Sequence, residues 1–188
     1  RVDRRQRQMC IRDSGSAVLR HGQHRSGKLA LLEELLSTIL AEGEKALIFT
    51  QYKEFGEYLS DYVRKRFGVP APFLHGSLRR EERDAMVDSF QSPDGPPIMV
   101  LSLKAGGTGL TLTAANHVIH YDRWWNPAVE NQATDRAYRI GQTKDVQVRK
   151  LVCDGTIEER IDDIISHKST MSDLVVSTGE TWLTELDD

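Results

Sequence analysis

The sequence has few cysteines and no long apolar run. Its 188 residues include two cysteines, Cys10 and Cys153, which lie too far apart in the chain to form a zinc knuckle. No apolar stretch approaches the ~18 residues that cross a bilayer, and the first residues contain no apolar signal-peptide core. These absences argue against a disulfide-rich secreted protein, a metal site and a membrane protein. We expect a cytoplasmic protein, associated with the nucleoid in a bacterium or located in the nucleus of a eukaryote.

A phosphate-binding loop of the Gly-x-x-x-x-Gly-Lys-Ser/Thr type is also absent from the sequence. The net charge of −3 is unevenly distributed: residues 1–27 hold seven arginines and two aspartates, whereas residues 151–188 hold two basic and ten acidic residues. Residues 28–150 are balanced, with sixteen of each sign. Bulk charge therefore gives no support to nucleic-acid binding, and any such function must depend on local groups.

The length and the composition, with 39% apolar and 28% charged residues, indicate one globular domain with a sizeable core. Residues 1–25 lack any sustained apolar period, so we expect a poorly ordered basic arm, which is either a nucleic-acid tail, a linker or a non-native junction. We place the domain in residues 26–155. A C-terminal helix and an acidic tail follow in residues 156–188.

Helical and strand patterns alternate along the domain. Helices are predicted over residues 28–42, 55–67 and 79–90, after Pro127, and from Thr156 to about Met171; strands are predicted over residues 45–52, 71–76, 98–102, 116–122 and 146–153. This alternation predicts a three-layer α/β fold with a mainly parallel central sheet. In such folds the ligand binds at the carboxyl ends of the strands.

Four loops follow these strand ends: Gln51 and Tyr52, residues 75–77, residues 102–110 and residues 122–127. The third loop, "SLKAGGTGL", contains glycines whose amides could form a nest for an anion, although it could equally be a tight turn. The fourth, "YDRWWNP", has adjacent tryptophans; at least one ring would reach solvent or a nucleic acid, unless both cap the core.

The stretch "NQATDRAYRIGQ" places Gln132, Arg136 and Arg139 four and then three residues apart, which in a helix is one face. Two guanidinium groups and an amide on one face predict an anion partner. The alternative is a solvated helix on which the arginines form ion pairs with Asp135 or Glu130.

The joint order of "ALIFTQY", "FLHGS", the block from Leu101 to Gln142 and "GTIEERI" resembles the carboxyl-terminal helicase lobe of SWI/SNF-type ATPases, within helicase superfamily two. The resemblance covers about residues 26–186. It implies a RecA-like lobe that works with an N-terminal RecA-like lobe, which would hold most of the ATP and Mg²⁺. It also implies that residues 156–188 are a brace and a truncated tail, so that the chain is a fragment.

The resemblance implies roles for individual residues. Arg136 and Arg139, with Gln132, match the arginine-finger motif, which is catalytic. Residues of the glycine loop match a segment that couples nucleotide to DNA: Gly107, Thr108 and Gly109. The positions that match DNA contacts in the family are Gln51, His75, Gly76, Ser102, Lys104 and Trp125. No metal-ligating set is implied within this lobe.

The function that this resemblance implies is a motor lobe of a double-stranded DNA translocase or remodeller, inactive alone. Which DNA-bound complex it moves, for example RNA polymerase, stays open. Two alternatives remain: a non-catalytic α/β module that binds nucleic acid or protein through the same loops, and an RNA helicase lobe. The double-tryptophan loop and "RIGQ" disfavour the RNA helicase. An upstream reading frame that encodes the first lobe would decide against the non-catalytic module.

Overall fold

The computed structural model of the 188-residue chain describes residues 6–9, 27–103, 110–122, 126–137, 145–154 and 158–160. The helices are α2 (Gly27–Ala41), α3 (Lys53–Phe67), α4 (Arg80–Gln91) and α5 (Pro127–Thr134). The strands are β1 (Gln6–Met9), β2 (Ala46–Thr50), β3 (Phe73–Leu74), β4 (Ile98–Ser102), β5 (His117–His120) and β6 (Gln147–Asp154). Among these residues, no helix is long and apolar enough to cross a membrane.

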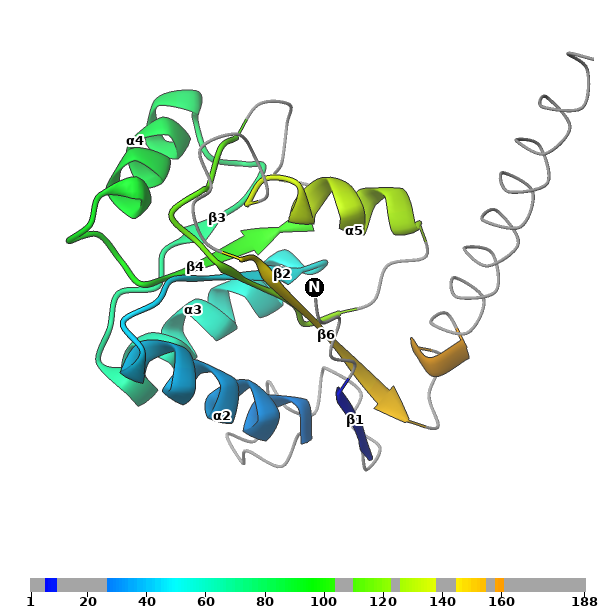
Figure 1. Cartoon of the computed structure of the whole chain (residues 1–188). Helices are drawn as coiled ribbons and strands as arrows, with labels where there is room; N and C mark the ends of the chain where they lie inside the picture. Colours follow the sequence, from blue (N-terminus) through cyan, green and yellow to red (C-terminus); the bar gives the residue numbers. More distant parts are fainter. Residues whose placement is uncertain are drawn as a thin grey trace, which may run out of the picture.

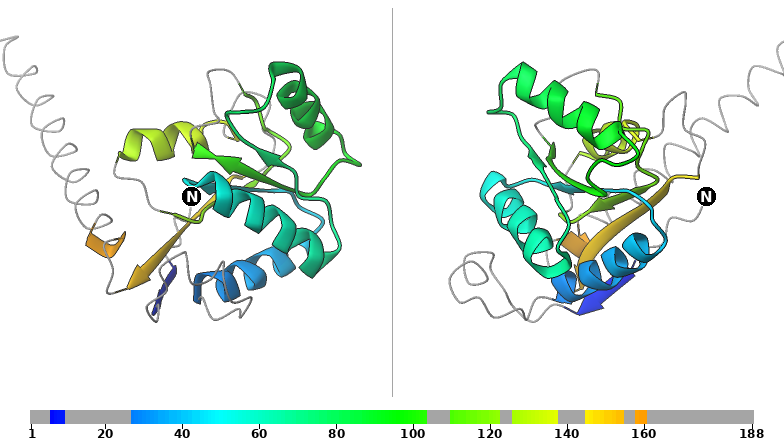
Figure 2. Two further views of the ribbon diagram at one scale, coloured as in Figure 1. Left: turned by 180° about the vertical axis from the view of Figure 1, so that it is seen from behind. Right: turned by 90° about the vertical axis from the view of Figure 1, so that its left-hand side faces the viewer.

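The strands form one sheet in the order β1-β6-β5-β2-β4-β3, and every pair of neighbours is parallel. Helices α2 and α3 cover one face of this sheet, and α4 and α5 cover the other (Figures 1 and 2). The three-layer α/β/α fold that the alternating pattern predicts is therefore confirmed. Because the strands are parallel, their carboxyl ends all meet at one edge of the sheet.

Each face of the sheet has its own hydrophobic core. Along β2, Ala46 and Ile48 face α2 and α3, whereas Leu47 and Phe49 face α4 and α5. This alternation follows from the period of two in a strand, and burial on both faces explains why β2 and β4 are apolar up to their last residues, Thr50 and Ser102. The first core also contains the apolar residues that define the amphipathic pattern of α2: Leu29, Leu32, Leu36 and Ile39.

Two helix ends match the residue types that the sequence places there. Helix α3 ends at Gly68, which has φ of 69° and whose N–H donates to the Arg64 carbonyl at 3.0 Å, as expected of a left-handed C-cap. Helix α5 begins with Pro127, and the Asn126 side chain accepts a hydrogen bond from the Ala128 N–H at 3.0 Å. These ends agree with the helix predicted over residues 55–67 and with the helix predicted after Pro127.

The structure departs from the predicted elements in the helix of the arginine motif. Helix α5 ends at Thr134, and the backbone continues in turns in which the Arg136 N–H bonds to the Ala133 carbonyl and the Ala137 N–H to the Thr134 carbonyl. The Arg136 carbonyl accepts a hydrogen bond from the Leu112 N–H at 2.9 Å, which is a tertiary contact beyond the end of the helix. The prediction that Gln132 and Arg136 share one helical face is therefore wrong.

The two ends of the chain are described only in part. Four residues of the expected arm form β1, which pairs with β6 and which no alternation in the sequence predicts. The rest of the arm, residues 1–5 and 10–25, lies outside the described residues, as does residue 26. Of the predicted last helix, residues 158–160 are helical, and residues 161–188 lie outside the described part as well.

Lys45 joins α4 to the start of the sheet. Its ammonium donates to the carbonyls of Phe90 at 2.8 Å, Ser92 at 2.5 Å and Gly95 at 3.4 Å, which are acceptors at and just beyond the C-terminus of α4. The Lys45 carbonyl accepts from the N–H of His117, the first residue of β5. Burial lowers the pKa of the Lys45 ammonium below its usual value, and Asp94 opposes this shift. One residue thereby holds α4, β2 and β5 in place.

We predict that Lys45→Met lowers the free energy of unfolding by about 1–3 kcal/mol, because three carbonyls lose their shared donor. Chemical denaturation would measure the difference. Lys65→Met on the exposed side of α3 is the matched control and is expected to change stability by less than about 0.5 kcal/mol. Equal stability of the two variants would contradict the role of Lys45.

Candidate functional site

The predicted ligand loops leave four neighbouring strands at one edge of the sheet. In sheet order, Asp122 follows β5, Gln51 follows β2, Ser102 ends β4 and His75 follows β3. Thr50 and Ser102 are register partners, so the last residues of β2 and β4 lie side by side. The fold therefore brings the described DNA-contact candidates into one row at the carboxyl edge.

A carboxylate ties the first two loops of this row together. The Asp122 Oδ2 atom accepts hydrogen bonds from the Thr50 hydroxyl at 2.6 Å and from the Gln51 N–H at 3.1 Å. Burial raises the pKa of Asp122 above its usual value, whereas these two hydrogen bonds and the charge of Lys28 lower it and Glu158 raises it. The Asp122 carboxyl group is thus held by two donors in a site whose burial disfavours its charged form.

Lys28 secures the same loop from the first turn of α2. Its side chain is buried, and its ammonium donates to the Tyr121 carbonyl at 2.8 Å. It also forms an ion pair with Glu158 at 2.6 Å, in the segment that follows β6. A lysine can occupy this buried position because a carboxylate neutralises its charge. The loop after β5 is therefore attached to both α2 and the segment after β6.

His75 and Gly76 form the turn between β3 and α4. The His75 ring packs against the Phe73 ring with centroids 5.1 Å apart, and the His75 carbonyl accepts from the Leu78 N–H at 3.2 Å. Gly76 is exposed, and a Cβ atom built on it would meet no other atom within 4 Å. The peptide groups of this turn are consequently accessible to a ligand that approaches the carboxyl edge.

Arg136 lies beyond the end of α5 and has 5% of its surface exposed, whereas Gln132 on α5 is exposed. The alternative of a solvated arginine face therefore does not hold for Arg136. Through its carbonyl, Arg136 is bonded to Leu112, two residues after the start of the described segment that follows the glycine loop. This hydrogen bond connects the backbone at Arg136 directly to that segment.

Polar side chains of α5, β5 and β6 bond to one another between α5 and the sheet. Glu130 is completely buried and lies 3.5 Å from the Lys150 ammonium on β6. The Thr134 hydroxyl donates to the Glu130 carbonyl at 3.1 Å, so it accepts from Nε2 of the buried His120 at 3.0 Å. Directional bonds of this kind fix the position of α5 on the sheet more narrowly than apolar packing alone.

Six of the predicted site residues lie outside the described residues. They are Lys104, Gly107, Thr108 and Gly109 in the glycine loop, Trp125 in the tryptophan loop, and Arg139. The structure therefore brings Gln51, His75, Gly76 and Ser102 to one edge and describes Gln132 and Arg136 separately on and after α5. Roles for all of these residues remain predictions.

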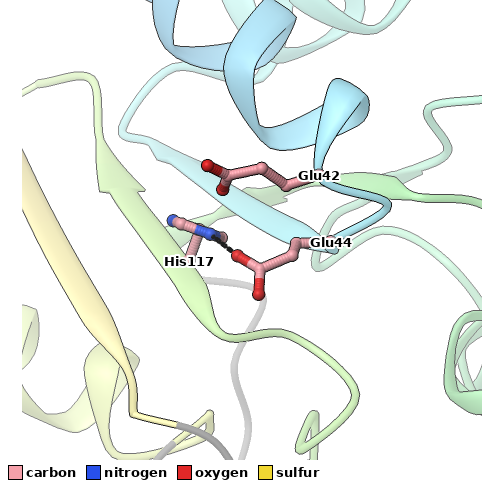
Figure 3. Close-up of side chains that lie close together, drawn as sticks. All are labelled: Glu42, Glu44 and His117. Carbon is pink, nitrogen blue, oxygen red and sulfur yellow. Dashed lines mark hydrogen bonds and ion pairs between the residues drawn. The ribbon is translucent and has the colours of Figure 1, made fainter.

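Among the described residues, three metal-ligating side chains meet at the opposite edge of the sheet: Glu42, Glu44 and His117 (Figure 3). Their ligand atoms lie within 4.8 Å of one another. However, an Arg149 Nη1–H donates to His117 Nδ1 at 2.8 Å, so the proton of the neutral ring is on Nε2, which donates to Glu44. A metal ion at Nε2 would have to displace this proton, and it would lie close to the positive charge of Arg149. The arrangement therefore favours a hydrogen-bonded cluster over a metal site.

Lys28, Asp122 and Glu158 belong to one network that no pattern in the sequence predicts. Their separations along the chain are 94, 36 and 130 residues, so no local spacing connects them. A signal was available for one of them only: Asp122 immediately follows a buried strand, at the expected ligand edge. The partners of Lys28 are brought to it by the fold, because both lie far from it in the chain.

Comparison with known proteins agrees with this architecture. The family model described as "Helicase conserved C-terminal domain" matches residues 27–141. YwqA of Bacillus subtilis (strain 168) is 57% identical over 162 residues, which cover 86% of this chain and 17% of YwqA. The human chromatin-remodeling ATPase INO80 is 44% identical over 154 residues, covering 82% of this chain and 10% of INO80. The chain thus spans less than a fifth of the length of these relatives.

Two solved structures from Sulfolobus solfataricus are also similar. Its SWI2/SNF2 ATPase core in complex with dsDNA aligns with a TM-score of 0.70 and 43% identity, covering 90% of this chain and 36% of that one. Its SWI2/SNF2 ATPase C-terminal domain aligns with a TM-score of 0.66 and 40% identity, covering 91% and 70% of the two chains. The parallel sheet is thus the RecA-like fold of these domains, and the chain belongs to the helicase conserved C-terminal domain family as a C-terminal lobe of the SWI/SNF-type ATPases.

Proposed function

We propose that this lobe is the second motor lobe of an ATP-dependent translocase or remodeller that acts on double-stranded DNA. The observation that carries the proposal is Arg136, a buried guanidinium at the end of α5 whose backbone is bonded to the segment after the glycine loop. In this proposal, Arg136 and Arg139 are the arginine fingers, and Gln132 belongs to the same motif. The first lobe and the DNA are partners of the site.

The chemistry of the arginine side chain supports this role. A planar guanidinium donates several N–H bonds to phosphoryl oxygens, and its positive charge stabilises the negative charge that develops during phosphoryl transfer. An arginine finger accelerates hydrolysis by roughly 10³ to 10⁵, which corresponds to about 4–7 kcal/mol of transition-state stabilisation.

The described residues fit a nucleotide only on its phosphate side. Arg136 would offer donors to phosphoryl oxygens of the terminal phosphate, and the 188 residues contain no Gly-x-x-x-x-Gly-Lys-Ser/Thr loop to cradle the other phosphates. Bound Mg²⁺-ATP would supply the phosphoryl group and the metal charge, held mainly by the first lobe. In this chain, Arg136 and Arg139 would orient the phosphate, and Gly107, Thr108 and Gly109 would couple it to DNA.

The row of loops at the carboxyl edge supports the DNA part of the proposal. Gln51, His75, Gly76 and Ser102 follow or end three adjacent strands, as residues that track one phosphate backbone would. Lys104 and Trp125 complete the proposed contact set. The archaeal relative with a similar fold was solved with double-stranded DNA. Residues 28–150 have no excess positive charge, so we expect modest DNA affinity for this lobe alone.

We predict that Arg136→Ala and Arg139→Ala each lower DNA-stimulated ATP hydrolysis by the full-length, two-lobe protein at least ~10²-fold, because each removes a guanidinium from the transition state. Arg136→Lys is expected to restore little, since lysine lacks the planar fork. Steady-state turnover at saturating duplex DNA measures this. Arg64→Ala on the exposed surface of α3 is the control, and near-normal turnover in both finger variants would refute the assignment.

We also predict that the 188-residue chain alone hydrolyses no ATP above background, because the groups that hold Mg²⁺ and the β-phosphate belong to the first lobe. The assay compares this chain with the full-length protein at equal molar concentration and saturating DNA. Substantial turnover by the chain alone would overturn the two-lobe proposal.

Duplex DNA is expected to stimulate the full-length ATPase more strongly than duplex RNA. A translocase that follows a B-form backbone has its contacts spaced for B-form phosphates, and the A-form of RNA displaces them. Stimulation curves with DNA and RNA duplexes of the same sequence would measure the preference. Stronger stimulation by RNA would favour an RNA helicase.

A further inference from the structure

We propose that Asp122 is a positioning residue that locks the end of β2 to the loop after β5, so that Gln51 and the start of that loop meet DNA as one rigid unit. This inference rests on the proposed function, because it assigns DNA to the carboxyl edge. Asp122 is not among the helicase-motif residues named above.

The geometry that supports this role is a continuation of the sheet. The ladder between β2 and β5 includes the pair of Phe49 and His120, and the Tyr121 N–H donates to the Phe49 carbonyl at 2.9 Å. Beyond that point the strands end, and the Asp122 carboxylate takes the place of the next backbone acceptor. It receives the Gln51 N–H at 3.1 Å, which extends the connection by one residue into the loops.

The second bond to the carboxylate comes from Thr50, which is completely buried. A single oxygen, Oδ2, accepts from both the Thr50 hydroxyl and the Gln51 N–H. These two bonds fix the distance and the orientation of the Gln51 backbone relative to β5. Two directional hydrogen bonds to one oxygen restrict the relative movement of the two loops more than apolar contact would.

Lys28 adds a connection on the other side of the loop. It binds the Tyr121 carbonyl, adjacent to Asp122, and Glu158 neutralises it from the segment after β6. Asp122 is therefore held between β2 on one side and the α2 and β6 segments on the other.

The chemical choice of aspartate also indicates a site beyond packing. Burial disfavours the ionised form of Asp122, and Lys28 and Glu158 act on the same carboxyl group as charged neighbours. Titratable groups whose pKa is shifted by burial and by specific charge partners concentrate at functional sites. The carboxylate of Asp122 meets this description at the edge where the ligand loops converge.

Asp122→Ala in the full-length protein tests the inference. Loss of both hydrogen bonds is expected to raise the duplex DNA concentration for half-maximal ATPase stimulation about tenfold, with less than about a threefold change in the maximal rate. Asp122→Asn keeps an acceptor for both donors and is expected to stay within about twofold of wild type. A defect of stability alone would lower the yield of folded protein but would leave the half-maximal DNA concentration unchanged.

Thr50→Val provides a second test because it removes one donor with little change in the shape of a buried side chain. We expect it to raise the half-maximal DNA concentration about threefold, and it decides the question if Asp122→Ala does not fold. Asp61→Ala, which removes an exposed carboxylate on α3, is the matched control.

Half-maximal concentrations equal to wild type in Asp122→Ala and Thr50→Val, with normal stimulation in the Asp61→Ala control, would overturn this inference and leave the proposed function intact. Absence of DNA stimulation in wild type and control would instead refute the proposed function, and this inference with it.

Discussion

The parallel pairing of β2 with β4 and β5 is the constraint on which the rest of the lobe depends. Ala46–Thr50 on β2 is buried along its whole length, with alternate residues in two separate cores. A shift of register by one residue would exchange the two sets and place each residue in the wrong core. Since the register is fixed, the carboxyl ends of four strands reach the same edge, and the loops with the candidate ligand residues lie in a row.

Polar groups restrict the positions of these loops more strongly than apolar packing can. Asp122 connects the ends of β2 and β5, Lys28 connects that loop to Glu158, and Glu130 with Lys150 supports α5. Each of these groups is costly to bury and is stabilising only when its partner is in place. The lobe thereby combines a rigid apolar sheet with an edge whose geometry depends on a few charged side chains.

The sequence was sufficient to predict the layers, the parallel sheet and the loops at its carboxyl edge, because apolar periodicity and helix-capping residues are local signals. Strand β4 and the start of α5 agree with the predictions. It was insufficient for the end of α5, because the Arg136 carbonyl bonds to Leu112, a contact 24 residues away in the chain. The partners of Lys28 were inaccessible for the same reason, since their burial is a property of the folded lobe.

The central claim is that Arg136 acts on the transition state of ATP hydrolysis in a complete two-lobe ATPase. The most direct test is trapping of ADP with aluminium fluoride, a transition-state analogue, by the full-length protein on duplex DNA, since such analogues bind far more tightly than the substrate. The wild type is expected to form a long-lived complex, and Arg136→Ala is expected to lose it while still binding a non-hydrolysable ATP analogue. Equal trapping by both proteins would contradict the claim.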